Sequence, residues 1–545
     1  MMSLCGDSLL KTIRLRGRLH VLDADLSAWS PRRNACATIC LANESPPELT
    51  VMSLRKWLIL THRYLGIALS LLFVVWFLSG IGMIYAGGMP RLTPALRLAR
   101  EPPLDLTRIR LTASEAAAKA GRPSPGRVVL LTIMDRPAYR LSAGRPVTVF
   151  ADNGELLAAI DEAGVMAIAS RFMDLPVGRL AHAGVLRSAD QWTIAQRGQM
   201  PLHKIAADDA ARTELYISAR LGEVVVHTTR GSRALAWAAA IPHWLYFAPL
   251  RVNDALWRQV VLWTSGLGIV LAIIGLALAI IQFSPSRPLR VGRIGSYIPY
   301  AGWMRWHYIT GVVFGVFTLT WVFSGLLSME PWDWVDRGGA GGGLREALTG
   351  GPLDLSRFPA IDAAAWDHVV RGHTVKEVEF LRAQDDPYYL VRGSEPAPLL
   401  LAANPLGVKR ESFSIASIMT RVREGAPNVP IAESAVLTDY DSYYYARDPN
   451  PPLPVVRIKF SDPNRTWVYV DPAMSQVVAQ FTGRKRVERW VYHGFHSLDF
   501  GFWYLKRPLW DIGVIALSLG GAASSAIGLF VGFRRLARRV KRMVF

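Results

Sequence analysis

Four of the eleven histidines in this sequence form two matched pairs, and their side chains are the strongest candidates for chemistry. The first pair lies in two long apolar stretches, LTHRYLGIALSLLFVVWFLSGI from residue 60 and RWHYITGVVFGVFTLTWVFSGL from residue 305. A shift of 245 positions superimposes the two stretches without a gap. The shift brings four features into register: His62 with His307, Gly66 with Gly311, Trp76 with Trp321, and Ser79-Gly80 with Ser324-Gly325.

The second pair occurs in the motif H-x-L-x-F, at His243 and His496, fourteen residues before Trp257 and Trp510. A shift of 253 positions relates these motifs and the apolar stretches after them, and a shift of 250 relates parts of the regions between. The sequence therefore predicts a tandem duplication. Because each copy enters and leaves the membrane on the same side, a pseudo-two-fold axis along the membrane normal would relate the copies. Such an axis brings the two members of each pair face to face.

Two opposed imidazoles favour haem over zinc as the bound group. Zinc usually takes four protein ligands, or three and a water, and no acidic residue or cysteine accompanies His62 or His307. Haem supplies four nitrogens itself and needs only one or two axial ligands. The sequence thus predicts two haem b groups, one held by His62 and His307 and the other by His243 and His496. His493, three residues before His496, is the alternative ligand.

Small and aromatic residues on the same helices are candidate cofactor-binding residues. A glycine one turn after the histidine, on the same helix face, leaves room for a macrocycle; a second glycine recurs eighteen residues on, about 27 Å along the helix. The alternatives are helix–helix packing for the glycines, and an aromatic belt at the membrane surface for the second histidine pair. The tryptophans are better explained by packing than by electron relay. These candidates are Gly66, Gly311, Gly80, Gly325, Trp76 and Trp321.

Composition indicates a membrane protein, because hydrophobic residues make up 51% of the 545 residues and the mean hydropathy is +0.20. A span needs about 20 mostly apolar residues, and four segments qualify. The predicted order is a basic N-terminal segment (1–51), a first span (52–88), a first exported domain (89–255), a second span (256–284), a short loop (285–305), a third span (306–330), a second exported domain (331–508), a fourth span (509–534) and a basic tail (535–545). Residues 1–51 are either a cytoplasmic arm or an over-extended start, with Met52 as the alternative first residue.

The net charge of +19 does not indicate nucleic-acid binding, because the basic residues cluster in short flanks of the spans. Arg55 and Lys56 precede the first span, and the short loop and the tail contain arginines but no acidic residue. Such flanks mark the cytoplasmic side, which places both termini inside and both large domains outside. All three cysteines precede the first span, at Cys5, Cys36 and Cys40, so the exported domains contain no disulfide or cysteine-ligated cluster.

The exported regions are predicted to be α+β domains. Arg127–Asp135 with Ala138–Gly144, and Val455–Asp462 with Thr466–Pro472, alternate as hairpins do, and Ala113–Gly121 is typical of a short helix ended by glycine. The sequence contains no Gly-rich phosphate loop and no dinucleotide fingerprint. An electron donor would therefore be separate, either quinol or a cytoplasmic reductase. The remaining histidines, among them His182 and His203, lack matched partners and are predicted to be surface residues.

The HRYLGI and HYITGV spans, with large exported inserts, resemble the PepSY-associated transmembrane helix family over about residues 52–540. The segment YISARLGEVV at Tyr216 and its copy YVDPAMSQVV at Tyr469 are similar to the strand–turn–strand end of a PepSY unit. The first copy departs from the family's usual D-P-x-x-G turn. The resemblance implies a bacterial inner-membrane protein with two PepSY-like periplasmic domains, of the iron-regulated kind that includes di-haem ferric-siderophore reductases.

The leading hypothesis is a di-haem electron conduit in the lipid bilayer that reduces a ferric complex, such as a ferric siderophore, on the periplasmic side. The alternative is a haem-free regulator whose PepSY-like domains bind or restrain a periplasmic partner such as a peptidase. The segment Asp439–Pro452, rich in tyrosine, could line a substrate surface but is better explained as a loop. The sequence leaves open which ferric complex is used, which donor supplies electrons, and the oligomeric state.

Overall fold

The computed structural model describes residues 53–285, 289–291, 294–333, 341–395, 397–445 and 451–544. The N-terminal segment 1–51 with its three cysteines lies outside these residues, as do parts of the short loop 285–305 and of the tyrosine-rich segment. The predictions for those parts therefore stay predictions. Below, the first half denotes residues 53–285 and the second half the described residues from 294 onward.

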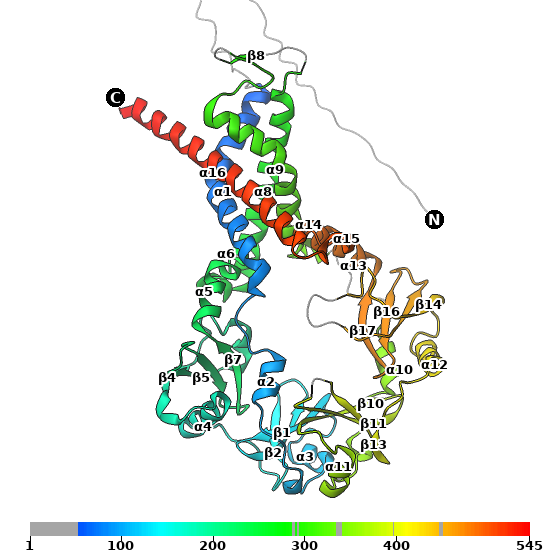
Figure 1. Ribbon diagram of the computed structural model, residues 1–545. Helices are drawn as coiled ribbons and strands as arrows, with labels where there is room; N and C mark the ends of the chain where they lie inside the picture. The colour runs from blue at the N-terminus through cyan, green and yellow to red at the C-terminus, as the bar shows by residue number, and fades with distance from the viewer. Residues whose placement is uncertain are drawn as a thin grey trace, which may run out of the picture. The chain divides into compact units, whose positions relative to one another are not determined.

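Four long helices form one bundle, in which α1 packs against α8 and α16, and α9 packs against α8 and α16 (Figure 1). Each is long and apolar enough to cross a membrane, which agrees with the four predicted spans. Their shared core is built from Leu69, Phe73, Phe77, Leu271, Val322 and Ala522. The last helix continues through the basic residues that the sequence assigned to a separate tail. The helices are α1 (Leu54–Ala86), α8 (Asp254–Gln282), α9 (Gly302–Leu327) and α16 (Leu509–Val544).

A seven-stranded antiparallel sheet takes strands from both halves, in the order β13-β12-β11-β10-β1-β2-β3. The halves meet where β1 pairs with β10, and there Val129 lies opposite Glu379, a residue 250 positions later. Helices α3 (Ala113–Lys119) and α11 (Ala363–Val369) contribute to the core on one face of this sheet. The strands are β1 (Arg127–Ile133), β2 (Arg136–Ser142), β3 (Val147–Phe150), β10 (Val375–Ala383), β11 (Asp386–Gly393), β12 (Leu399–Ala403) and β13 (Leu406–Val408).

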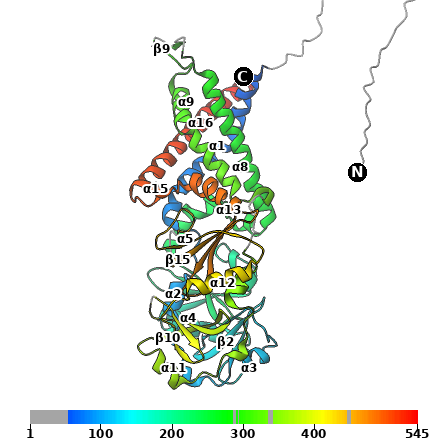
Figure 2. The same cartoon turned by 90° about the vertical axis from the view of Figure 1, so that its right-hand side faces the viewer.

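Each half also contains a four-stranded antiparallel sheet, in the orders β4-β5-β6-β7 and β14-β15-β16-β17. Helix α4 (Glu162–Met173) packs on the first of these and α12 (Ile415–Gly425) on the second (Figure 2). The predicted hairpins and the α+β class are thus confirmed. The strands are β4 (Leu180–Leu186), β5 (Leu202–Ala207), β6 (Glu214–Ser218), β7 (Glu223–Thr228), β14 (Ile431–Leu437), β15 (Val455–Phe460), β16 (Trp467–Asp471) and β17 (Gln476–Phe481).

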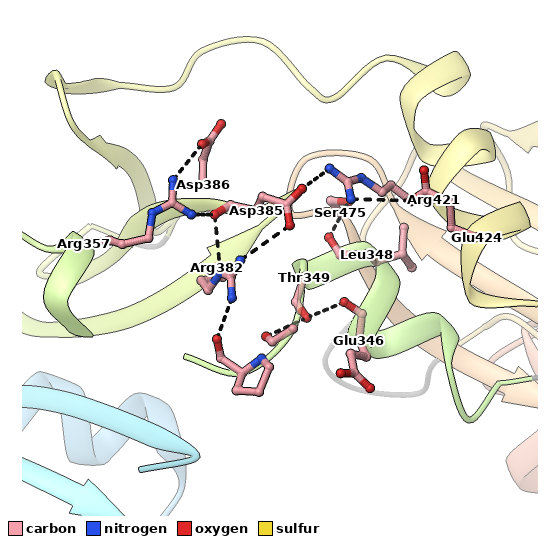
Figure 3. Close-up of polar contacts among 12 residues, drawn as sticks. Glu346, Leu348, Thr349, Arg357, Arg382, Asp385, Asp386, Arg421, Glu424 and Ser475 are labelled. Atoms are coloured by element: carbon pink, nitrogen blue, oxygen red, sulfur yellow. Dashed lines mark hydrogen bonds and ion pairs between the residues drawn. The ribbon is translucent and has the colours of Figure 1, made fainter. Parts of the chain in front are cut away.

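In each half, an aspartate in a hairpin turn of the seven-stranded sheet pairs with the helix that covers the four-stranded sheet. Asp385 lies in the β10–β11 turn with φ 76° and forms an ion pair with Arg421 of α12, while its carbonyl accepts from Arg382 at 3.3 Å (Figure 3). In the first half, Asp135 of the β1–β2 turn has φ 62° and pairs with Arg171 of α4. An aspartate tolerates this left-handed backbone and also supplies the charge. The turn is therefore fixed to the helix that covers the neighbouring sheet.

Short helices connect the four-stranded sheets to the bundle. In each half a short helix with a histidine in its last turn is followed by another short helix, and then by a long one. In the first half these are α5 (Arg230–Ala238), α6 (Ala240–Trp244) and α7 (Ala248–Arg251); in the second they are α13 (Gly483–Glu488), a π-helix (Arg489–Gly494), α14 (Phe495–Ser497) and α15 (Gly501–Tyr504). Other described elements of the chain include α2 (Pro94–Arg100), α10 (Leu344–Thr349), β8 (Leu289–Val291) and β9 (Ile294–Ser296).

Candidate functional site

The first histidine pair joins α1 to α9. The ring centroids of His62 and His307 lie 6.2 Å apart, with 37° between the ring planes. The Nδ1 atom of His62 lies 3.2 Å from the carbonyl oxygen of Leu271 in α8, and that of His307 lies 3.2 Å from the carbonyl oxygen of Ser524 in α16. A carbonyl oxygen only accepts, so each Nδ1 carries the proton. The Nε2 lone pair is then available to bind a metal.

The second pair joins the short helices α6 and α14. The ring centroids of His243 and His496 lie 6.0 Å apart, with 64° between the planes. The Nδ1 of His243 lies 3.2 Å from the carbonyl oxygen of Trp76 and 3.3 Å from Oγ of Ser79. The Nδ1 of His496 lies 3.1 Å from Oγ of Ser324. The predicted pairing of imidazoles is thus present at both positions, and His496 rather than His493 forms the ring pair with His243.

The motif H-x-L-x-F has a local structural explanation. The leucine two residues after each histidine ends its short helix in the left-handed region, with φ 51° at Leu245 and 50° at Leu498. The phenylalanine two residues further on is the N-cap of the next short helix. The indole of Trp257 donates to the carbonyl of Trp244 at 2.9 Å, and that of Trp510 donates to the carbonyl of Ser497 at 3.1 Å. Both carbonyls belong to the residue directly after the histidine, so the first turn of each long helix holds the segment that carries the histidine.

Glycines lie directly against the histidine rings, although not all of them are the glycines that the sequence singled out. A Cβ added at Gly275 would lie 2.8 Å from Cε1 of His62, and one at Gly528 would lie 2.8 Å from Cε1 of His307. These two glycines superimpose when the sequence is shifted by 253 positions, within Ile274-Gly275-Leu276 and Ile527-Gly528-Leu529. That match is the sequence signal that could have identified them as candidate site residues. Their role as ring supports was not predicted.

The predicted glycines divide into two groups. A Cβ at Gly80 would lie 3.3 Å from Cε1 of His243, and one at Gly325 would lie 3.7 Å from Cε1 of His496. Gly66 and Gly311 line a cavity beside the first pair instead, where an added Cβ would meet nothing closer than 3.9 Å. The first group therefore supports rings, while the second leaves space open.

The cavity beside the first pair measures about 390 Å³, within the range of small-molecule sites. Both histidines line it, and its wall is made of small and apolar residues with a few polar groups. Two of these are cations, Arg63 and Arg535. The buried Nε of Arg63 has no hydrogen-bond partner among the described residues. A cation with an unsatisfied donor at such a site suits a ligand that carries carboxylates.

The spacing of the rings in the two pairs is compatible with a metal between the imidazoles. A metal–imidazole bond of about 2.0–2.1 Å, plus about 1.1 Å from nitrogen to ring centre, places two axial imidazoles about 6.3 Å apart. The observed 6.2 and 6.0 Å agree with this value. By contrast, His182 and His203 lie 5.2 Å apart and share a direct hydrogen bond of 3.0 Å. Among the described residues, no group of three or more histidines, cysteines and acids could hold a metal, so the donor set suits haem better than zinc.

The aromatic candidates lie in the core between the two pairs. Trp76 stacks on Phe73 with centroids 5.9 Å apart, and Trp321 lies 5.8 Å from Phe77. Both tryptophans pack against the core of the bundle. The indole nitrogens of both are buried and have no hydrogen-bond partner within the described part of the chain. This placement agrees with a packing role.

The tyrosine-rich loop supports the second pair, which the sequence did not reveal. Tyr445 donates to Asp499 at 2.5 Å, and Arg489 donates to the carbonyl of Ser442 at 3.2 Å. Arg489 and Asp499 form a buried ion pair at 3.4 Å on either side of His496 in the sequence. Because a buried charge needs its partner, this pair helps to hold the segment that carries His496.

The two unmatched histidines that the sequence assigned to the surface have a different setting. His182 of β4 and His203 of β5 are partly buried, and Glu162 of α4 lies 3.3 Å from Nδ1 of His182. They form a local polar contact between two strands and a helix. Both side chains keep part of their surface exposed, so this contact does not contradict the prediction of surface residues.

No family model matches this chain, and no curated protein matches it at a significant level.

Proposed function

We propose that this protein is a di-haem electron carrier of the bacterial inner membrane that reduces a ferric complex on the periplasmic side. The observation that carries the proposal is the pair of ring spacings, 6.2 and 6.0 Å, combined with a protonated Nδ1 on His62 and His307. The resemblance of the spans to the PepSY-associated family supports the same function. Haem b bound at each pair would supply a one-electron Fe(III)/Fe(II) couple.

The residues of the chain have distinct parts in this proposal. The four imidazoles would hold the haem groups, and helix carbonyls and hydroxyls hold their tautomers. Arg63 and Arg535 neutralise carboxylates at the first site. Because Phe73, Phe77 and the two tryptophans fill the bundle between the pairs, water is excluded from that region. Because two histidines would hold the group at each site, the ferric substrate would be reduced at the surface of the protein.

The proposed orientation rests on charge. Basic flanks at Arg55, Lys56 and the end of α16 place both termini in the cytoplasm and the β-rich domains, PepSY-like by resemblance, in the periplasm. The tandem duplication would then place the first pair near the cytoplasmic face and the second near the periplasmic face. The donor is quinol or a cytoplasmic reductase, and the acceptor is a ferric siderophore or another ferric chelate.

The test is a reduced-minus-oxidised spectrum of the purified protein and of four histidine variants. We expect two b-type centres in the wild type. His62→Ala and His307→Ala should each lose one centre and retain the other, whereas His243→Ala and His496→Ala should do the reverse. His182→Ala, which removes a histidine of the other kind of pair, is the matched control and should retain both.

A wild-type protein that binds no haem after expression with haem supplementation would contradict the proposal. That result would favour the haem-free regulator, in which the β-rich domains bind a periplasmic partner. Retention of both centres in all four variants would contradict the ligand assignment.

A further inference from the structure

A buried serine lies between a helix carbonyl and a histidine of the second pair, once in each half. Oγ of Ser79 is 3.2 Å from the carbonyl oxygen of Trp76 and 3.3 Å from Nδ1 of His243. In the second half, Oγ of Ser324 is 3.0 Å from the carbonyl oxygen of Trp321 and 3.1 Å from Nδ1 of His496. The two serines are only 2% and 0% exposed.

The chemistry of these contacts fixes their direction. A hydroxyl has one proton to donate and two lone pairs that accept, whereas a carbonyl oxygen only accepts. The carbonyl oxygen of Trp76 lies 3.2 Å from Nδ1 of His243 and can only accept, so this Nδ1 carries the hydrogen and Nε2 is the free nitrogen. Ser79 then donates to the carbonyl three residues earlier and turns a lone pair to the imidazole. Ser324 makes the same two contacts with Trp321 and His496, and the same assignment satisfies both of them.

We propose that Ser79 and Ser324 are positioning residues that fix the tautomer and the orientation of the second pair and raise the electron donation of its Nε2 atoms. The proposal rests on the proposed haem-binding function. Partners of this kind orient a ligating histidine and raise its basicity, and their loss typically weakens metal binding about 10- to 100-fold.

The first pair provides an internal comparison. Its Nδ1 atoms face the main-chain carbonyls of Leu271 and Ser524, which no side-chain substitution removes. Removal of the serine hydroxyls should thus change the second centre alone. His243 also has the Trp76 carbonyl within 3.2 Å, so Ser79→Ala should have a small effect by itself, and the double variant is the decisive one.

The experiment uses the full-length haem-loaded protein with Ser79→Ala, Ser324→Ala and the double variant. Haem transfer to an apo-globin, the midpoint potentials and the electron paramagnetic resonance spectrum are measured, and the second centre is assigned from His243→Ala. In the double variant we expect about 10- to 100-fold weaker binding at the second centre. We also expect a higher midpoint potential, because a less basic imidazole stabilises the ferric state less, and an altered low-spin signal.

Three controls separate positioning from general damage. The first centre, measured in the same sample, reports whether the bundle is intact and should be unchanged. Ser265→Ala removes a hydroxyl buried to a similar degree in α8 and should change neither centre. Ser324→Thr, introduced alone, retains a hydroxyl and should leave the midpoint potential of the second centre unchanged.

The outcomes distinguish the two proposals. If the wild type binds two haems and the double variant keeps the affinity, potential and signal of its second centre, the serines have no positioning role and the haem proposal stands. If the wild type binds no haem, both proposals fail. If both centres change equally in the double variant, the serines act on the bundle rather than on the second pair, and the inference is again overturned.

Discussion

The two glycines that support the first histidine pair allow a sharp test of the site. Gly275→Ala and Gly528→Ala each introduce a Cβ 2.8 Å from the ring of the facing histidine, whereas ordinary contacts begin near 3.4 Å. The ring must then withdraw by about 0.6 Å, more than the roughly 0.5 Å within which a functional ligand has to be held. The ring cannot swing away freely, because its Nδ1 is bonded to a helix carbonyl.

The expected change in haem affinity and the expected change in folding stability differ in size, so a damaged site can be told apart from a damaged helix. Alanine is favoured over glycine in a helix by about 0.8–1.0 kcal/mol, whereas overpacking a tight contact costs about 1–3 kcal/mol. We therefore expect the free energy of unfolding of the haem-free protein to change by about 2 kcal/mol or less. Haem binding at the first site should weaken about 10- to 100-fold, as it does when a ligating histidine loses its orientation.

The assay measures haem per protein and the spectrum of each centre, together with thermal unfolding in detergent. The chain offers graded controls, because an added Cβ lies 3.3 Å from the ring at Gly80 and 3.7 Å at Gly325, and at Gly66 it meets no ring atom within 4 Å. We expect a moderate loss at the second centre for Gly80→Ala, little loss for Gly325→Ala and none for Gly66→Ala. Full occupancy and an unchanged spectrum of the first centre in Gly275→Ala would refute the reasoning.

Three further predictions follow from other parts of the molecule. Gly66→Leu should fill part of the first cavity and lower haem occupancy while the protein still inserts; full occupancy would make Gly66 an ordinary packing residue. Vesicles loaded with reductant should reduce an impermeant ferric chelate on the periplasmic side, and normal rates in His243→Ala would contradict transfer through the second site. Burial raises the pKa of Glu101 to about 7. The folded state therefore holds this proton more tightly than the unfolded chain, and stability should fall by about 3 kcal/mol as the pH rises from about 4.5 through 7. Glu101→Gln should flatten that slope in thermal unfolding between pH 5 and 8, and an unchanged slope would exclude Glu101 as its source.

The four long helices and the hairpins were predictable because their signals are local. An apolar stretch of more than 20 residues and a period-two alternation both depend on a few neighbouring side chains. The joining of β1 to β10 was not predictable in this way, since it pairs strands about 250 residues apart. One polar contact at this junction is equally distant in sequence: the almost fully buried Glu377 bonds Arg97 at 2.5 Å, in addition to its neighbour on the adjacent strand, Arg392, at 2.7 Å.

The histidine pairs were predictable because the internal repeat supplied a second copy to compare. The supports of the rings were harder to assign, because the carbonyls of Leu271 and Ser524 are main-chain groups without a side-chain signature. Gly275 and Gly528 matched in sequence, but only the packing of α8 against α1 and of α16 against α9 shows which ring each of them faces. The contact of the tyrosine-rich loop with Asp499 depends on tertiary structure in the same way.

The distribution of supports between the halves explains why both halves are needed to form each ring pair. The Nδ1 of each histidine faces a group from its own half: α8 for His62, α1 for His243, α16 for His307 and α9 for His496. Each ring pair nevertheless takes one histidine from each half. A single half could thus hold two imidazoles in the correct tautomer but would supply only one ligand to each site. The antiparallel pairing of β1 with β10 and the contacts between α1 and α16 then bring two pre-oriented sets together, so the free energy of assembling the halves is also what completes both sites.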